Sequence, residues 1–399
     1  RRGMTQPLLI GGATTSRMHT AVKIAQQYDN GVIHVLDASR SVTVAGSLLS
    51  KEQKADFLSG IKGEYDKLRD DFANKKTVKN YLRFEEAQKN TAVIDWNNFT
   101  PVVPTFTGTK TFTTYDLKEI AAYIDWQPFF IAWEMHGKFP AILTDSVIGK
   151  EATILYNDAQ KLLQQIIDEK WLNAKGAIGF WPANKVAADS VDVLADKEVI
   201  KLQFLRQQIK KTAGQPNLSL ADFIAPAEKN YQDYIGAFAV TIEGIEPHIK
   251  KFEAGHDDYN KIILQALADR LAEAFAELLH KKTRQEYWGY ATDEHLTNEQ
   301  LIKEEYLGIR PAPGYPACPD HTEKYKLFQL LGGKENTGIT LTESLAMYPA
   351  SSVSGWYFAN PESKYFGIGK INEDQLHDYA ARKGMSIEDA TRWLRPILE

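Results

Sequence analysis

The chain has 399 residues, of which 43% are hydrophobic and 25% are charged, and it carries a net charge of −5 at pH 7. This length suffices for two or three domains with a sizeable core. The negative charge argues against a general nucleic-acid-binding protein. No apolar run approaches the roughly 20 residues that a membrane-spanning helix needs. We therefore expect neither nucleic acid nor a membrane as a partner.

The single cysteine, Cys318, excludes an internal disulfide and any metal site built from several cysteines. A free thiol suits a reducing compartment, so we expect the cytoplasm. The chain opens with Arg1 rather than methionine and shows no signal-peptide pattern, which indicates a piece of a longer cytoplasmic protein.

Two short apolar runs, each followed by a helical pattern, open the chain. The first, Pro7–Ile10, ends in Gly11 and Gly12, and the second, Val32–Leu36, leads into a helix near Ala38. This order predicts parallel strands joined by right-handed crossovers, and ligands of such sheets lie beyond the carboxyl ends of the strands. Gly11, Gly12 and Ala38 are therefore expected at one rim of the sheet.

A parallel sheet of only two strands is not a stable domain. We therefore interpret residues 1–75 as the C-terminal part of a doubly wound α/β domain whose front half lies upstream of residue 1. A charged helix from Lys51 to roughly Asn74 closes this part, and the basic run at 75–80 suits a linker. We place the domain boundary there and assign residues 76–399 to a second domain.

In the second domain, strand and helix patterns are mixed without a βαβ rhythm, which favours an α+β fold on a mostly antiparallel sheet. Strands are expected at 129–133, 177–181, 193–194, 200–204, 235–240 and 351–358, with a turn and a returning strand after 360–361. Helices are expected at 116–124, 151–168, 258–281, 298–305, 374–383 and 387–394.

The segment Gly308–Pro319 contains four prolines and predicts a stiff, irregular loop. Arg310 offers a planar fork to a carboxylate. Gly314 permits close backbone approach, and Tyr315 supplies a flat face. This combination suits a small zwitterionic ligand, and the alternative is a proline-rich surface turn with a solvated arginine.

Several carboxylates have both a structural and a functional interpretation. Asp125 ends a predicted helix, where a carboxylate needs a partner, either a nearby capping donor or a ligand ammonium. Asp269, Glu273 and Glu277 lie four residues apart on one helix face. They form either a solvated acidic stripe or a row that meets a cation. Glu304 precedes the proline loop and is expected to face the same pocket.

Four blocks resemble cobalamin-dependent methionine synthase: the Gly-Gly turn, the Tyr-Ile-Asp-Trp motif, the loop Arg-Pro-Ala-Pro-Gly-Tyr-Pro-Ala-Cys-Pro and the aromatic block near the end of the chain. The resemblance covers nearly the whole chain. It implies that residues 76–399 are the reactivation domain, which binds S-adenosylmethionine. Residues 1–75 would be the C-terminal part of the cobalamin-binding domain.

The resemblance also implies roles for individual residues. Contacts with S-adenosylmethionine are implied for Asp125, Arg310, Ala312, Tyr315, Tyr365 and Phe366. Contacts with the corrin are implied for Gly11, Gly12 and Ala38, for which a plain strand–helix turn is the alternative. Contacts of a cap over the corrin are implied for Asp269, Glu273 and Glu304.

The chain departs from the family pattern at two places. The family has two adjacent tyrosines where this chain has Tyr365 and Phe366, so a ring contact can persist there but a hydroxyl hydrogen bond cannot. The cobalt-ligating signature Asp-x-His-x-x-Gly is missing, since Asn298 follows His295 where its glycine belongs. We assign no metal site, expect the cobalt ligand upstream, and expect zinc only in the N-terminal part of the full enzyme.

The implied function is a repair reaction. Cob(II)alamin is reduced by one electron from flavodoxin or another donor, and a methyl group from S-adenosylmethionine then regenerates methylcobalamin. The enzyme can then resume methyl transfer from methyltetrahydrofolate to homocysteine. Such a protein acts by aligning its reactants, so we assign no catalytic residue.

Two alternatives remain for the function. The chain could be a non-catalytic module that binds S-adenosylmethionine, docks flavodoxin and works with upstream domains of the same enzyme. It could also be a free-standing methyltransferase acting on a small molecule. Residues 76–399 lack the glycine-rich strand–helix turn that such an enzyme normally carries.

Overall fold

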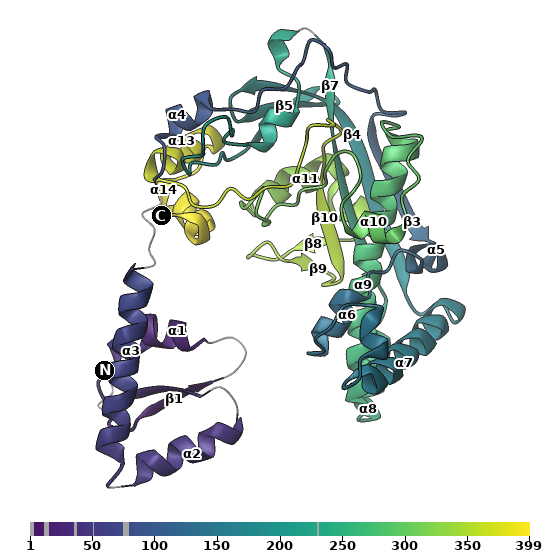
Figure 1. Cartoon of the computed structure of the whole chain (residues 1–399). Helices are drawn as coiled ribbons and strands as arrows, with labels where there is room; N and C mark the ends of the chain where they lie inside the picture. Colours follow the sequence, from purple (N-terminus) through teal and green to yellow (C-terminus); the bar gives the residue numbers. More distant parts are fainter. Residues whose placement is uncertain (1–3, 12–15, 36–37, 51, 75–79, 230) are drawn as a thin grey trace. The chain divides into compact units, whose positions relative to one another are not determined.

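The structure is a computed structural model that describes residues 4–11, 16–35, 38–50, 52–74, 80–229 and 231–399. The chain forms two compact units, Arg1–Asn80 and Tyr81–Glu399, and each is described by itself (Figure 1). Among the residues described, no helix has the length and apolar character needed to cross a bilayer.

The first unit contains a two-stranded parallel sheet, as predicted. β1 (Leu8–Gly11) pairs with β2 (Val32–Val35). The helices of this unit are α1 (Arg17–His19), α2 (Ala38–Leu49) and α3 (Lys54–Asn74). Tyr65 of α3 is buried, and its hydroxyl accepts a 2.8 Å hydrogen bond from the backbone N–H of His34. This bond ties the charged helix to the sheet.

The second unit is built on a six-stranded sheet in the order β10-β7-β4-β5-β6, with β3 also paired to β4. All of its pairings are antiparallel, so the predicted α+β class is confirmed. Its strands are β3 (Gly108–Tyr115), β4 (Asn173–Ala187), β5 (Ser190–Ala195), β6 (Glu198–Gln203), β7 (Asp233–Glu243) and β10 (Ser352–Tyr357). β8 (Thr340–Leu341) and β9 (Met347–Tyr348) form a separate small pair.

Helices surround this sheet. They are α4 (Phe84–Lys89), α5 (Leu117–Ala121), α6 (Gln127–Ala132), α7 (Gly149–Asp168), α8 (Ile245–Ala254), α9 (Asp258–Lys282), α10 (Asn298–Ile302), α11 (Glu323–Leu331), α12 (Gly333–Thr337), α13 (Glu373–Lys383) and α14 (Ile387–Leu394). Short 3-10 or π-helical turns lie at Thr20–Ile24, Ala25–Gln27, Ala141–Thr144, Leu220–Phe223, Ala227–Lys229, Thr283–Tyr287 and Arg395–Ile397.

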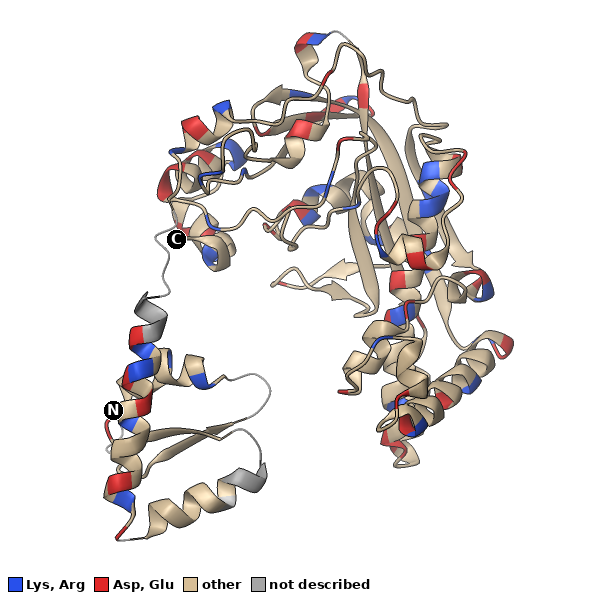
Figure 2. Ribbon diagram, in the orientation of Figure 1, with Lys and Arg blue, Asp and Glu red and all other residues tan. Residues whose placement is uncertain are grey.

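Both faces of the sheet are buried by helices, and side chains along its central strands alternate between the two cores. On β4, Ile178 and Phe180 join a core formed with α7 and α9. Ala177 and Trp181 point the other way and join a core formed with α11. The central strands consequently carry few charged side chains, whereas the helices carry many (Figure 2).

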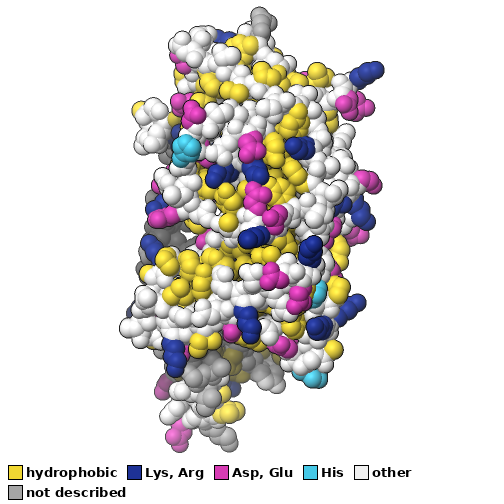
Figure 3. Space-filling model, turned by 90° about the vertical axis from the view of Figure 1, so that its right-hand side faces the viewer, with side chains coloured by type: hydrophobic (Ala, Val, Ile, Leu, Met, Phe, Trp, Pro, Cys, Tyr) yellow, Lys and Arg dark blue, Asp and Glu magenta, His cyan; other side chains and the backbone are white. Residues whose placement is uncertain are grey.

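The surface mixes both signs of charge. On the face shown in Figure 3, acidic and basic side chains are interspersed among hydrophobic ones. Neither sign dominates this face, so it offers no single-sign field that would steer a charged polymer toward it.

Residues 129–133 are the clearest error of the sequence-based assignment, because they belong mostly to the helix α6 rather than to a strand. A run of five apolar residues cannot by itself distinguish the two. Pro128 stands in the first turn of α6, and the carboxylate of Asp125 accepts a 2.9 Å hydrogen bond from the N–H of Gln127. Both are signals of a helix start.

Two further assignments need correction. The helix predicted at 116–124 is shorter, because α5 ends at Ala121. No returning strand follows β10 among the described residues 359–370. The chain turns at 361–362 instead, and Ile368 donates its N–H to the carbonyl of Pro316 at 2.8 Å.

A buried ionic group joins distant parts of the second unit. Arg206 donates from Nε to Asp189 and from both Nη atoms to Asp222, each at 2.8 Å. It also donates to the carbonyl of Asn217 at 2.6 Å. The side chains of the arginine and the two aspartates are at most 1% exposed. Each charge is therefore paired where solvent cannot screen it.

We predict that Arg206→Met destabilises the second unit by about 3–5 kcal/mol, because Asp189 remains buried without its cation and Asp222 keeps only Lys185. All eight tryptophans belong to this unit, so their fluorescence during urea unfolding reports on it alone. Arg395→Met, at an exposed position, is the control and should change the free energy of unfolding by less than about 0.5 kcal/mol. A loss below 1 kcal/mol for Arg206→Met would contradict the prediction.

Candidate functional site

The proline loop is fastened to the outer edge of β10. Ile309 and Phe358 exchange two backbone hydrogen bonds of 3.0 Å each, and Trp356 donates its N–H to the carbonyl of Pro311 at 2.9 Å. The prolines fix φ along the loop. Arg310, between two of these attachment points, therefore has a fixed backbone position.

The tip of the loop is a tight turn. Gly314 donates its N–H to the carbonyl of Cys318 at 2.7 Å, and Tyr315 donates to Ala312 at 3.1 Å. Gly314 has a φ of +96°, and a Cβ there would lie 2.2 Å from the ring of His321. Only glycine fits this position without strain. Cys318 is buried, and burial raises the pKa of its thiol, an effect increased by nearby acidic groups.

A cavity of about 560 Å³ lies beside the loop. It brings together most of the residues predicted to bind S-adenosylmethionine, namely Arg310, Ala312, Tyr315, Tyr365 and Phe366. Two predicted cap residues, Glu273 and Glu304, line it as well. Further residues line the cavity that no sequence pattern indicated, among them Lys324, Met347 and three consecutive residues of β10, Ser352–Ser354.

Arg310 makes two hydrogen bonds in this region. Its Nη2 donates to Oε2 of Glu277 at 2.6 Å, and its backbone N–H donates to the hydroxyl of Tyr365 at 3.0 Å. The Tyr365 hydroxyl in turn lies 3.1 Å from that of Tyr306. Arg310 Nη1 is buried and has no hydrogen-bond partner among the described residues. One arm of the guanidinium is thus fixed and the other is unpaired.

The acidic row on α9 separates into three environments. Glu277 is buried against Arg310, and Glu273 is exposed at the cavity. Asp269 is exposed and accepts a 2.6 Å hydrogen bond from the hydroxyl of Ser351. At the cavity, burial raises the pKa of Glu304 and Glu277 adds to this, while Arg310 opposes it.

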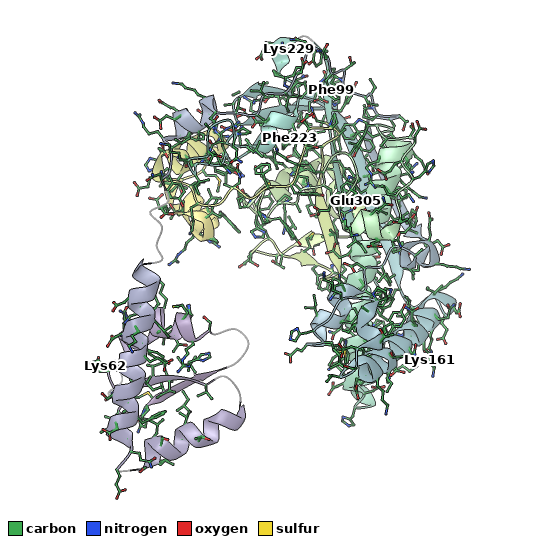
Figure 4. All side chains as sticks on the ribbon, in the orientation of Figure 1. Lys62, Phe99, Lys161, Phe223, Lys229 and Glu305 are labelled. Carbon is green, nitrogen blue, oxygen red and sulfur yellow. The ribbon has the colours of Figure 1, made fainter. Side chains whose placement is uncertain are left out.

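Phe366 keeps a ring where the family has its second tyrosine. The ring lines the cavity and contacts Phe223, labelled in Figure 4, edge-on with 6.3 Å between centroids. Phe223 is buried in the core that includes α11. The phenylalanine is therefore held by packing, and no hydroxyl is needed to place it.

Asp125 does not line this cavity. It lies just before α6, and its carboxylate serves as a capping acceptor for Gln127. The premise that it opposes the dipole at a helix end is wrong, because the α6 N-terminus favours a negative charge. Its predicted contact with a ligand remains untested.

In the first unit, Gly11 lies opposite Val35, where the two parallel strands end. A Cβ on Gly11 would lie 2.7 Å from the Val35 carbonyl oxygen, so strand packing alone requires glycine there. Gly12 and the side chain of Ala38 lie outside the described residues; the backbone of Ala38 begins α2. Among the residues described, no group of His, Cys, Asp and Glu side chains could hold a metal ion.

The antiparallel sheet, the proline-framed arginine and the adjoining cavity define an α+β domain with a candidate site for a small, amino-acid-like ligand. Residues 116–384 match the family described as vitamin B12 dependent methionine synthase, activation domain. The chain belongs to this family. It is also similar to a crystal structure of the MetH reactivation domain bound to AdoHcy, with 49% identity and a TM-score of 0.76. That match covers 80% of this chain and 98% of the other.

Behind Arg310 lies a histidine with unusual surroundings. His280 of α9 is fully buried, stacked on Tyr357 at 5.2 Å and edge-on to Tyr306 at 4.8 Å between ring centroids. Neither of its ring nitrogens has a partner among the described residues. Burial, with the positive charges of Arg284 and Arg310, lowers its pKa well below the usual value.

We predict that this histidine weakens the fold in mild acid. An unfolded histidine takes up a proton near pH 6.5, whereas His280 stays neutral in the folded chain. The free energy of unfolding should therefore fall as pH drops below 6.5, by about 1.4 kcal/mol between pH 7.5 and 5.5. His280→Phe should lack this contribution in urea unfolding followed by tryptophan fluorescence.

The difference in unfolding free energy between the wild-type chain and His280→Phe removes the contributions of other groups that titrate between about pH 7.5 and 5.5. One of them is Asp233, whose pKa burial raises to about 7. Equal changes with pH in the wild-type chain and in His280→Phe would show that the prediction is wrong.

Proposed function

We propose that the cavity beside the proline loop binds S-adenosylmethionine, and that the chain supports the reductive methylation of cob(II)alamin in methionine synthase. The observation that carries this proposal is Arg310, held on a stiff loop at a cavity, with one arm of its guanidinium unpaired among the residues that the structure describes. The related MetH reactivation domain, solved with AdoHcy, supports the same ligand class.

The residues present fit this ligand. A volume of about 560 Å³ is within the usual range for small-molecule sites. The ligand carboxylate would accept from Arg310 in a charge-assisted hydrogen bond. The rings of Tyr315, Tyr365 and Phe366 offer flat apolar faces to the adenosyl part.

The free edge of β10 offers backbone groups as well. Trp356 and Phe358 donate away from β7, to the proline loop. Because hydrogen-bonding direction alternates along a strand, Ser354 also directs its N–H and C=O away from β7. Ser354 lines the cavity. Its backbone donor and acceptor suit the edge of an adenine ring.

In the proposed reaction, S-adenosylmethionine supplies an activated methyl group and cobalamin supplies the nucleophile. The contribution of this chain is to bind and orient the methyl donor, which is catalysis by positioning. Three carboxylates would face the corrin when the domain caps it: Glu273 and Glu304 at the cavity, and Asp269 one turn before Glu273 on α9. A flavodoxin or another one-electron donor would complete the reaction.

We further propose that residues 1–75 are the end of the cobalamin-binding domain. Parallel strands that end together at Gly11 and Val35 provide a rim suited to a ligand. Leu8 and Leu9 of β1, whose side chains point to opposite faces of the sheet, are 42% and 39% exposed, which suits a sheet that further elements would cover. Gly11, Gly12 and Ala38 would line the corrin at this rim.

We predict that Arg310→Ala weakens binding of AdoHcy by roughly 10- to 150-fold, since a hydrogen bond to a charged group contributes about 1.5–3 kcal/mol. Isothermal titration calorimetry of the whole chain measures this directly. Arg395→Ala, an exposed arginine outside the cavity, is the matched control. Equal affinities for the wild-type chain and Arg310→Ala would count decisively against the assignment.

Asp125 gives a second prediction. Asp125→Asn removes the charge but keeps an oxygen that can accept from Gln127, so α6 should remain capped. If Asp125 also binds the ligand ammonium, this variant should bind AdoHcy roughly tenfold more weakly. Its affinity for 5′-methylthioadenosine, which lacks the amino-acid part, should be unchanged. Unaltered binding of AdoHcy would leave Asp125 with the capping role alone.

One experiment separates the reaction from a purely binding and docking role. The chain is mixed with S-adenosylmethionine, cobalamin and a one-electron reductant, with and without the remaining domains of methionine synthase. We expect methylcobalamin, detected by its absorbance, only when those domains are supplied. Ligand binding without methylation in both mixtures would favour the docking module.

A further inference from the structure

We infer that Glu277 is a positioning residue of this site, acting through Arg310. The inference rests on the proposed function, and it concerns a residue outside the set expected to touch the ligand. Glu277 lies on α9 one turn beyond Glu273, which lines the cavity. It thus stands beside the guanidinium that the ligand would meet, on a helix of 25 residues.

The ion pair itself is short and sheltered. Oε2 of Glu277 accepts from Nη2 of Arg310 at 2.6 Å, and the two side chains are 12% and 21% exposed. Burial alone would lower the pKa of Arg310, but Glu277, together with Tyr306 and Tyr365, outweighs burial and raises it. Glu277 therefore balances the charge of a partly buried guanidinium and holds it in one orientation before any ligand arrives.

The pair is not fully satisfied within the chain. Oε1 of Glu277 and Nη1 of Arg310 are both buried, and neither has a partner among the described residues. By contrast, four of the guanidinium contacts of Arg206 are closed by aspartates and a carbonyl. A buried donor left unpaired costs about 1–3 kcal/mol. A ligand carboxylate that reaches the guanidinium would recover part of that cost.

Two roles for Glu277 make opposite predictions. As a positioning residue, it removes the rotational freedom of Arg310, so its loss weakens ligand binding. As a competitor, it occupies the guanidinium that a ligand carboxylate needs, so its loss strengthens binding. Glu277 contacts Nη2 of Arg310 and leaves Nη1 without a partner among the described residues. Because Nη1 stays available to a ligand carboxylate, this geometry favours the positioning role.

The test compares Glu277→Leu and Glu277→Gln with the wild-type chain by calorimetry, using AdoHcy and 5′-methylthioadenosine as probes. We expect Glu277→Leu to weaken AdoHcy binding at least about tenfold and to change methylthioadenosine binding less than about twofold. Glu277→Gln keeps an oxygen for Nη2 and should rescue AdoHcy affinity to within roughly threefold of wild type.

The outcomes are distinguishable. A wild-type chain that binds neither probe overturns the proposed function and, with it, this inference. Equal or tighter AdoHcy binding by Glu277→Leu overturns the inference alone. Equal losses for both probes, or failure of Glu277→Gln to restore binding, would mean that Glu277 supports the fold rather than Arg310. Tryptophan fluorescence during urea unfolding shows which variants remain folded.

Discussion

The position of the proline loop in the second unit depends on the hydrogen bonds that it makes with the β10 edge of the antiparallel sheet. At the β10 edge, backbone groups that another strand would otherwise use are taken by the proline loop, through Ile309 and Pro311. An exposed strand edge would invite association with other chains. Here the same groups fix a loop that prolines have already made stiff, and the arginine between the two attachment points gains a defined place.

Buried charge is handled in two ways in this unit. Around Arg206, donors and acceptors satisfy one another, as expected for a group that holds segments together. Around Arg310, several buried polar atoms, including those of Glu277 and His280, have no hydrogen-bond partner in the part of the chain that the structure describes. Unsatisfied polar groups concentrated beside a cavity are typical of a site that is completed by something outside the chain. The difference between the two groups supports the proposed site without appeal to the family resemblance.

Much of this arrangement could be predicted from the sequence where local signals are strong. Prolines define the loop at Gly308–Pro319, and apolar spacing defines α9. The short apolar run in α6 was misassigned, because its helical signal lies in Asp125 and Pro128 before it.

The contacts across the fold could not be predicted in the same way. The pairing of Glu277 with Arg310 joins residues 33 positions apart. The edge at Ser352–Ser354 lines the cavity because the hydrogen bonds between the proline loop and β10 end at Pro311. No periodicity in the sequence encodes either contact. The family resemblance predicts a ligand contact for Arg310, but it does not predict that Glu277 pairs with Arg310.

The burial of Cys318 has a practical consequence for studying movement. Thiolates, not thiols, react with maleimides and similar reagents, so a buried thiol with a raised pKa stays inert under mild labelling. Cys318 should therefore not be labelled by thiol-reactive probes under mild conditions. A cysteine introduced on the exposed surface of each unit would carry a fluorophore or spin label without competition, and the separation between the two units could be followed in solution.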